Sequence, residues 1–220
     1  MIIPVLAPKL IDSLAGILLL TALLLVGSKK LVAAVRIIAL QSLILALLVA
    51  LVAYFTGVRH ILITAALTVV VKAVAIPYIL LYVIKKIGVN RDIEPYFNFT
   101  ASMLIATGLV VLAYYVSPPL GDSERSLTEN GLPVSIAMVL IGFFVMISRK
   151  KAVTQILGLM VMENGLFLAA LATTQGMPLV VELGVFFDIL VGVLIMGIFS
   201  YKINRTFHSI DTGRLNSLKG

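Results

Sequence analysis

Three ionisable side chains lie in the middle of long apolar segments of this sequence: Lys72, Glu163 and Asp188. On membrane-insertion scales, such a side chain at the centre of a bilayer costs roughly 2.5–3.5 kcal/mol, which an apolar residue would avoid. Burial in a medium of low dielectric disfavours the charged form of an acid or a base. Acids and bases buried together can therefore exchange protons near neutral pH, and a chain of such groups is a proton relay.

The three residues are predicted to lie at one depth in the membrane. Lys72 falls in segment 60–84, Glu163 in 152–173 and Asp188 in 177–201. Each follows the start of its segment by about 11 or 12 residues, or roughly 16 Å at 1.5 Å per residue, and half a hydrocarbon core is about 15 Å. We interpret the three as relay residues. The alternative for each is a structural role, in which a buried pair holds helices together.

Two further polar residues are candidates for accessory roles. Asn164 follows Glu163 directly and is about 100° away around a helix, so we expect it to hydrogen-bond a neighbouring helix. Glu182 lies about 9 Å nearer the predicted outer surface than Asp188. It marks either an outer proton exit or a solvated helix end. Gly158 and Gly165, on either side of Glu163, are small enough to allow close helix packing.

Pro77 is predicted to break the helix that carries Lys72. Proline has no backbone N–H, so the carbonyl of Ala73 loses its helical donor. A loosened helix beside a buried lysine can admit water at the middle of the membrane, as the broken helices of transporters do. A simple kink without a functional role is the alternative.

The elements that must position these residues are predicted to be membrane-spanning helices. The chain has 220 residues, of which 61% are hydrophobic, against about 45–50% in soluble domains. Its long apolar runs exceed the roughly 20 residues needed to cross a bilayer. We expect an all-α integral membrane protein with about seven transmembrane helices, near residues 8–27, 31–56, 60–84, 97–117, 132–148, 152–173 and 177–201.

The distribution of positive charge predicts the orientation. With the N-terminus outside, thirteen of the 17 Lys and Arg residues fall on the inner side, three on the outer side, and Lys72 within a span. Basic residues favour the cytoplasmic side, so the C-terminus is predicted to be cytoplasmic. The acidic loop 121–130 divides a four-helix N-terminal membrane region (1–120) from a three-helix module (131–205), and a cytoplasmic tail (206–220) follows. We expect a multi-pass protein of a prokaryotic inner (plasma) membrane.

Composition excludes several function classes. The chain has no cysteine, so it cannot hold thiolate iron–sulfur clusters or disulfides. Its two histidines, His60 and His208, lie at or beyond predicted membrane edges, which argues against haem or zinc inside the bundle. The chain has no glycine-rich phosphate loop for ATP. The net charge of +7 follows from the inner loops and does not indicate nucleic-acid binding. We expect no metal and no cofactor in this chain.

Two motifs resemble the K subunit of respiratory complex I and the C subunit of multisubunit cation/proton antiporters. They are LGLMVMENG at 157–165 and FFDILVGVLIMG at 186–197. In the second, Asp188 stands where the family has a Glu, and Gly192 follows it by four residues. In the first, Met160 stands where the complex I subunit has its key Glu, and Glu163 lies one helical turn later. Residues three apart share a helix face, so Glu163 can serve the same cavity about 4.5 Å along the axis.

The whole chain resembles component E of hydrogenase-4 and formate-hydrogenlyase-type complexes, and the stretch VVVKAVAIPYILL is similar to the third span of that family. The resemblance implies a subunit of a complex I-like membrane arm. Its neighbours would be antiporter-like membrane subunits, an H-type membrane subunit and a peripheral [NiFe]-hydrogenase-like or other redox module. Such a subunit belongs to an oxidoreductase complex but is not catalytic alone.

Three functions are compatible with these observations. The first is a non-redox subunit that contributes a midplane proton (or sodium) relay through Lys72, Glu163 and Asp188, coupled to electron transfer in partner subunits. The second is a free-standing secondary transporter, which equal inverted repeats would favour, but the spans divide four to three and show no repeat. The third is a non-conducting membrane scaffold in which the buried charges only pair helices.

Overall fold

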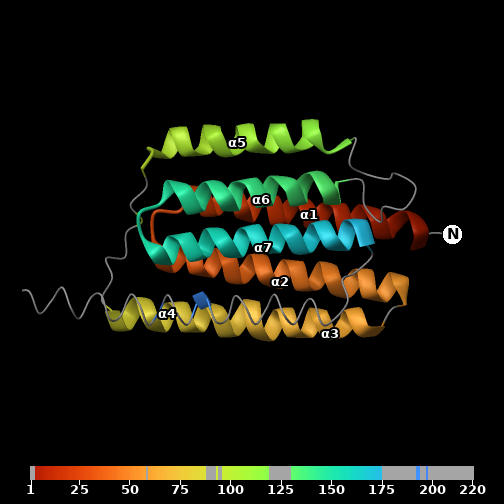
Figure 1. Cartoon of the computed structure of the whole chain (residues 1–220). Helices are drawn as coiled ribbons and strands as arrows, with labels where there is room; N and C mark the ends of the chain where they lie inside the picture. Colours follow the sequence, from red (N-terminus) through yellow and green to blue (C-terminus); the bar gives the residue numbers. More distant parts are fainter. Residues whose placement is uncertain are drawn as a thin grey trace, which may run out of the picture.

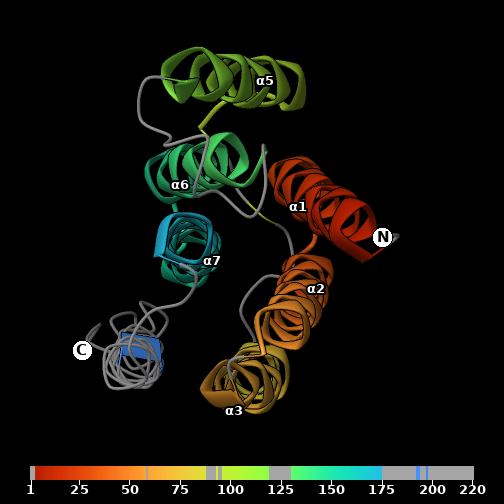
Figure 2. The same cartoon turned by 90° about the vertical axis from the view of Figure 1, so that its right-hand side faces the viewer.

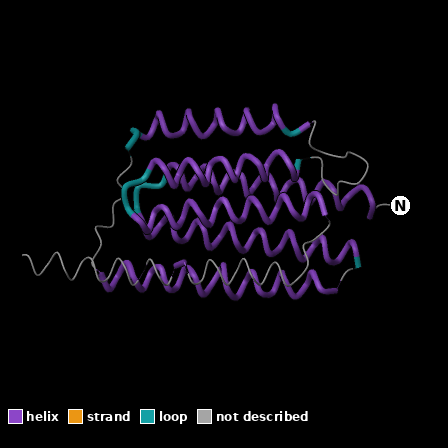
Figure 3. Tube along the Cα trace, viewed as in Figure 1, coloured by secondary structure: helices purple, strands orange, loops and turns teal. Residues whose placement is uncertain are grey.

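The computed structural model describes residues 3–57, 59–87, 93, 96–118 and 130–174, together with positions 192, 193 and 197. The helices are α1 (Ile3–Gly27), α2 (Leu31–Thr56), α3 (Arg59–Thr68), the π-helix η1 (Val69–Ala75), α4 (Ile76–Ile87), α5 (Phe99–Val116), α6 (Gly131–Ser148) and α7 (Ala152–Thr174). Figure 3 shows that helices joined by short loops make up this described part, which contains no β-strand.

Six segments are long and apolar enough to cross a membrane, with α3, η1 and α4 forming one continuous span. They confirm the predicted all-α membrane fold and match the first six predicted segments. The seventh, 177–201, lies outside the described residues except at three positions, and so do Glu182 and Asp188. The predicted orientation in the membrane stays a prediction.

The spans run side by side and form a layered bundle (Figure 1). Viewed end on (Figure 2), α5 lies at one edge and packs on α6, while α3 lies at the other edge and packs on α2. Between these edges, α1 contacts α2 and α6, and α7 contacts α6 and α2. The π-helix η1 also packs on α2. The helices that carry Lys72 and Glu163 therefore share α2 as a neighbour.

Glycines bring α6 and α7 unusually close together. A Cβ atom added to Gly142 would lie 2.5 Å from the backbone nitrogen of Met162 and 2.6 Å from the carbonyl oxygen of Gly158. One added to Gly165 would lie 2.9 Å from the carbonyl oxygen of Ser135. Real Cβ atoms do not approach the backbone of another helix this closely, so only glycine fits. The close packing predicted from Gly158 and Gly165 is confirmed, and it fixes the rotation of α7 and hence the direction of Glu163.

The predicted break at Pro77 does not occur, because the chain stays helical from Arg59 to Ile87. A π-helix, Val69–Ala75, precedes Pro77 instead, and the amide of Ile76 donates to the carbonyl of Val71, five residues earlier. This change in hydrogen bonding fits the effect expected of proline, which offers no N–H to the preceding turn. The wider turn accommodates that loss without ending the helix, and Lys72 lies within it.

Candidate functional site

Lys72 and Glu163 form an ion pair inside the bundle. Lys72 Nζ lies 2.5 Å from Glu163 Oε1. The lysine is 1% exposed and the glutamate 5%, so both charges are removed from the lipid-facing surface. Lys72 comes from the π-helix and Glu163 from the middle of α7. Lys72 and Glu163, which were predicted to lie at one depth in the membrane, are thus in contact.

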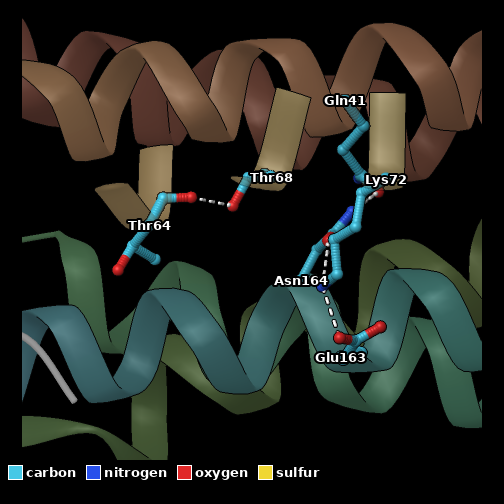
Figure 4. Close-up of polar contacts among 6 residues, drawn as sticks. All are labelled: Gln41, Thr64, Thr68, Lys72, Glu163 and Asn164. Carbon is cyan, nitrogen blue, oxygen red and sulfur yellow. Dashed lines mark hydrogen bonds and ion pairs between the residues drawn. The ribbon is translucent and has the colours of Figure 1, made fainter. Parts of the chain in front are cut away.

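Amide side chains extend the pair across the bundle (Figure 4). Lys72 Nζ donates to Asn164 Oδ1 at 3.2 Å, and Asn164 Nδ2 donates to Gln41 Oε1 at 3.1 Å. Gln41 Nε2 in turn donates to the carbonyl of Leu18 on α1 at 3.3 Å. Gln41 is fully buried and Asn164 is 1% exposed. A continuous polar path therefore connects η1, α7, α2 and α1 within an apolar interior.

Two buried threonines lie on the helix that carries Lys72. Thr64 and Thr68 are each 1% exposed, and the Thr68 hydroxyl donates to the Thr64 carbonyl at 2.9 Å. They precede Lys72 by two steps of four residues, so they lie on the same helix face. The polar stripe runs from the pair towards the Arg59 end of the span.

In the ion pair, the positive charge of Lys72 lies against the negative charge of Glu163. Attraction offsets part of the desolvation cost, but buried pairs of this kind are often no more stable than apolar residues of similar volume. Glu163 Oε2 is buried and accepts no hydrogen bond within the described part of the chain. Lys72 Nζ also lies 5.9 Å from the centre of the Phe167 ring, on the next turn of α7. The arrangement can transfer a proton directly between Nζ and Oε1.

The structure agrees with one accessory prediction and adds residues that were missed. Asn164 does hydrogen-bond a neighbouring helix, as expected. Gln41, Thr64 and Thr68 were not predicted. Gln41 had a signal in the sequence, because a polar pair, Gln41-Ser42, interrupts the otherwise apolar stretch 37–53. The threonines had none, since a hydroxyl that bonds its own helix is tolerated anywhere in a membrane span.

The described residues contain no group of three or more His, Cys, Asp or Glu side chains that could hold a metal ion. Glu163 is the only carboxylate at the described pair, and its neighbours are an ammonium, an amide and an aromatic ring. These groups suit proton exchange and hydrogen bonding, and a divalent cation would require more oxygen ligands.

The fold and the site define a class: a multi-pass membrane protein with an intramembrane ion pair. Comparisons with known proteins agree. Residues 132–220 match the family described as NADH-ubiquinone/plastoquinone oxidoreductase chain 4L. An uncharacterized protein of Mycobacterium tuberculosis is 32% identical over 211 residues, covering 96% of each chain. Hydrogenase-4 component E of Escherichia coli K12 is 28% identical over 211 residues, covering 96% of this chain and 98% of that protein. No solved structure matches the chain.

The chain therefore belongs to the hydrogenase-4 component E-like family, and its C-terminal part is similar to chain 4L. This is a family of membrane subunits related to respiratory complex I. The relatives span nearly the same length as this chain, so the similarity includes α2 and the segment with Lys72 as well as the 4L-like part with Glu163.

Proposed function

We propose that this chain is a non-redox membrane subunit of a complex I-like respiratory or hydrogenase complex, and that Lys72 and Glu163 form one station of a proton (or sodium) relay through it. The observation that supports this most is the ion pair itself, buried in mid-span and continued by Asn164 and Gln41. The chain binds no cofactor of its own in this proposal, and electron transfer takes place in partner subunits.

The direct contact between Nζ and Oε1 supports a relay role. A proton that moves from the ammonium to the carboxylate neutralises both groups, and the reverse step restores both charges. Burial disfavours the charged form of each group, so it brings the charged and neutral states of the pair closer in energy than they are in water. A charge arriving in a neighbouring subunit can then shift the balance between them. A coupled pair can thus take up a proton on one side and release one on the other.

The π-helix adds a second line of support. π-turns are rare and occur often at functional sites. Here the π-helix holds Lys72 and precedes Pro77. It leaves the backbone of this span less regular beside the pair than an α-helix would. Asp188 and Glu182, predicted from the sequence, would extend the relay towards the next subunit and the outer surface.

A scaffold role is the competing account, and one observation favours it: the same polar path ties four helices together. The amides alone could supply such a tie, without two charges. Ionisable residues inside a membrane are costly and are usually functional. The two accounts differ in what they predict when the charge is removed and the shape is kept.

The test is Glu163→Gln in the intact complex, with proton pumping measured in membrane vesicles alongside electron transfer. The relay predicts that assembly survives while pumping per electron falls sharply. Full pumping by Glu163→Gln would overturn the proposal and leave the scaffold account.

A further inference from the structure

A second polar cluster lies at one end of the bundle, away from the mid-span pair. The turns that join α1 to α2 and α6 to α7 lie at this end (Figure 1). A cavity of about 410 Å³ opens there, and the residues that line it include Ser28, Lys29, Phe97, Phe99, Ser102 and Arg149. The polar side chains in this lining are two serines, a lysine and an arginine, and none of the lining residues is acidic.

Arg149 is the buried cation of this cavity. It directly follows α6 and is 5% exposed. Its Nη2 donates to the carbonyl of Val26 at 2.7 Å, in the last turn of α1, where carbonyls lack helical partners. That bond uses one of the five N–H donors of the guanidinium. Burial lowers the pKa of Arg149 from its ordinary value. Arg149 forms no ion pair with any residue that the structure describes.

Two hydroxyl groups beside Arg149 lack partners. The Oγ atoms of Ser28 and Ser102 are buried and have no hydrogen-bond partner within the described ranges. Ser102 is 2% exposed as a residue. A buried polar group without a partner costs stability, and two such groups line one cavity together with a guanidinium. A guanidinium and hydroxyl groups can all donate hydrogen bonds to an oxyanion, and the bonds from a guanidinium are among the strongest.

The rim of the cavity combines a cation with aromatic rings. Lys29 is exposed, and Phe97 and Phe99 are 46% and 54% exposed. The amide of Tyr96 donates to the carbonyl of Ser148 at 3.0 Å, which ties the segment before α5 to the end of α6. The entrance is thus basic and apolar at once, and it adjoins α5, whose exposed face is apolar.

We propose that this cavity binds a phosphate group, presented by the headgroup of an acidic phospholipid or as the free ion. Arg149 would bind the anion through its remaining donors, Ser28 and Ser102 would donate their hydroxyl protons, and Lys29 would add charge at the entrance. Basic pockets between membrane helices suit such headgroups, and acyl chains can lie along the exposed α5. The site is separate from the relay and does not depend on it.

The experiment measures binding to the full chain purified in detergent. Phosphatidylglycerol, phosphatidylcholine and inorganic phosphate are the three probes, and binding is followed by native mass spectrometry and by the shift in melting temperature. The expected result is that phosphatidylglycerol binds and stabilises the protein and phosphatidylcholine does not. Phosphate that competes with the lipid indicates a headgroup site, and phosphate that binds where the lipid does not indicates a free-ion site; both support the proposal.

Variants locate the binding to this cavity. Arg149→Gln should weaken phosphatidylglycerol binding roughly tenfold or more, but it also removes a bond to α1. Ser102→Ala avoids this difficulty: without a ligand it removes an unpartnered hydroxyl and leaves the melting temperature unchanged or higher. With a ligand it should weaken binding about fivefold.

Lys85→Gln is the matched control, because Lys85 is exposed near the end of α4, at the same end of the bundle, and does not line the cavity. Its affinity should stay within about twofold of the unmodified protein. The proposal is overturned if neither anionic probe binds better than phosphatidylcholine, or if Ser102→Ala binds as tightly as the unmodified chain. It is also overturned if Lys85→Gln weakens binding as much as Arg149→Gln, which would mean that only surface charge matters.

Discussion

A double-mutant cycle on Lys72 and Glu163 separates the stability of the pair from its function. The three variants are Lys72→Met, Glu163→Leu and the combination of both. At 2.5 Å and an effective dielectric constant of about 20, the attraction between the two charges is about 6–7 kcal/mol. Each single change leaves the other charge buried without its partner, which costs about 3–5 kcal/mol. The double change removes both charges and costs less than either single change.

The assay has two readouts that the relay predicts will diverge. Thermal unfolding of the purified chain should show both single variants strongly destabilised and the double variant close to the unmodified protein. Proton pumping by the intact complex should be lost in all three, because the double variant restores packing but not the exchangeable proton. Stability thus recovers in the combination while function does not.

Two results would refute the reasoning. If the destabilising effects of the single changes simply add in the double variant, the charges do not interact and the pair is not formed. If the double variant both folds and pumps like the unmodified complex, the pair is a structural tie and no proton passes through it.

Two further predictions concern the surroundings of the pair. Gln41→Leu leaves the Asn164 amide without its acceptor, so the free energy of unfolding should fall by about 1–3 kcal/mol, while pumping is only partly reduced. Unfolding and pumping measured on one preparation check this prediction. Complete loss of pumping without destabilisation would instead place Gln41 in the relay. Gly142→Ala forces a Cβ to within 2.5 Å of the Met162 nitrogen and should prevent close packing of α6 on α7. Gly16→Ala is the control, because nothing lies within 4 Å of its Cβ, and it should express and melt like the unmodified chain. Equal stability of the two variants would contradict the packing described.

The six membrane spans that the structure describes could be predicted from the sequence because they follow from the length of each apolar run. The predicted segments 31–56 and 132–148 agree with α2 and α6 to within a residue. In a bilayer every backbone group must be paired within its own helix, so apolar length translates directly into helix length. The packing order of the helices could not be obtained in this way, because it depends on contacts such as those of Gly142 that join distant parts of the chain.

The centre of the site was predictable, but its extension across the bundle was not. Lys72 and Glu163 stand out because charge is rare in a membrane span, and a shared depth indicated that they could meet. Gln41 carries no charge, so depth alone did not single it out, and its contact with Asn164 depends on the rotation of α2 against α7. The π-helix was also missed, since Pro77 predicts a disturbed turn but not which hydrogen bonds replace the lost one.

The most direct test of the relay is infrared difference spectroscopy of the working complex, with the carbonyl-stretch region of protonated carboxyl groups recorded during turnover. The account predicts a band from a buried carboxyl that appears and disappears with turnover and is absent from the Glu163→Gln variant. A spectrum that is the same in both proteins would show that Glu163 never changes its protonation state, and would contradict the claim that protons pass through the Lys72–Glu163 pair.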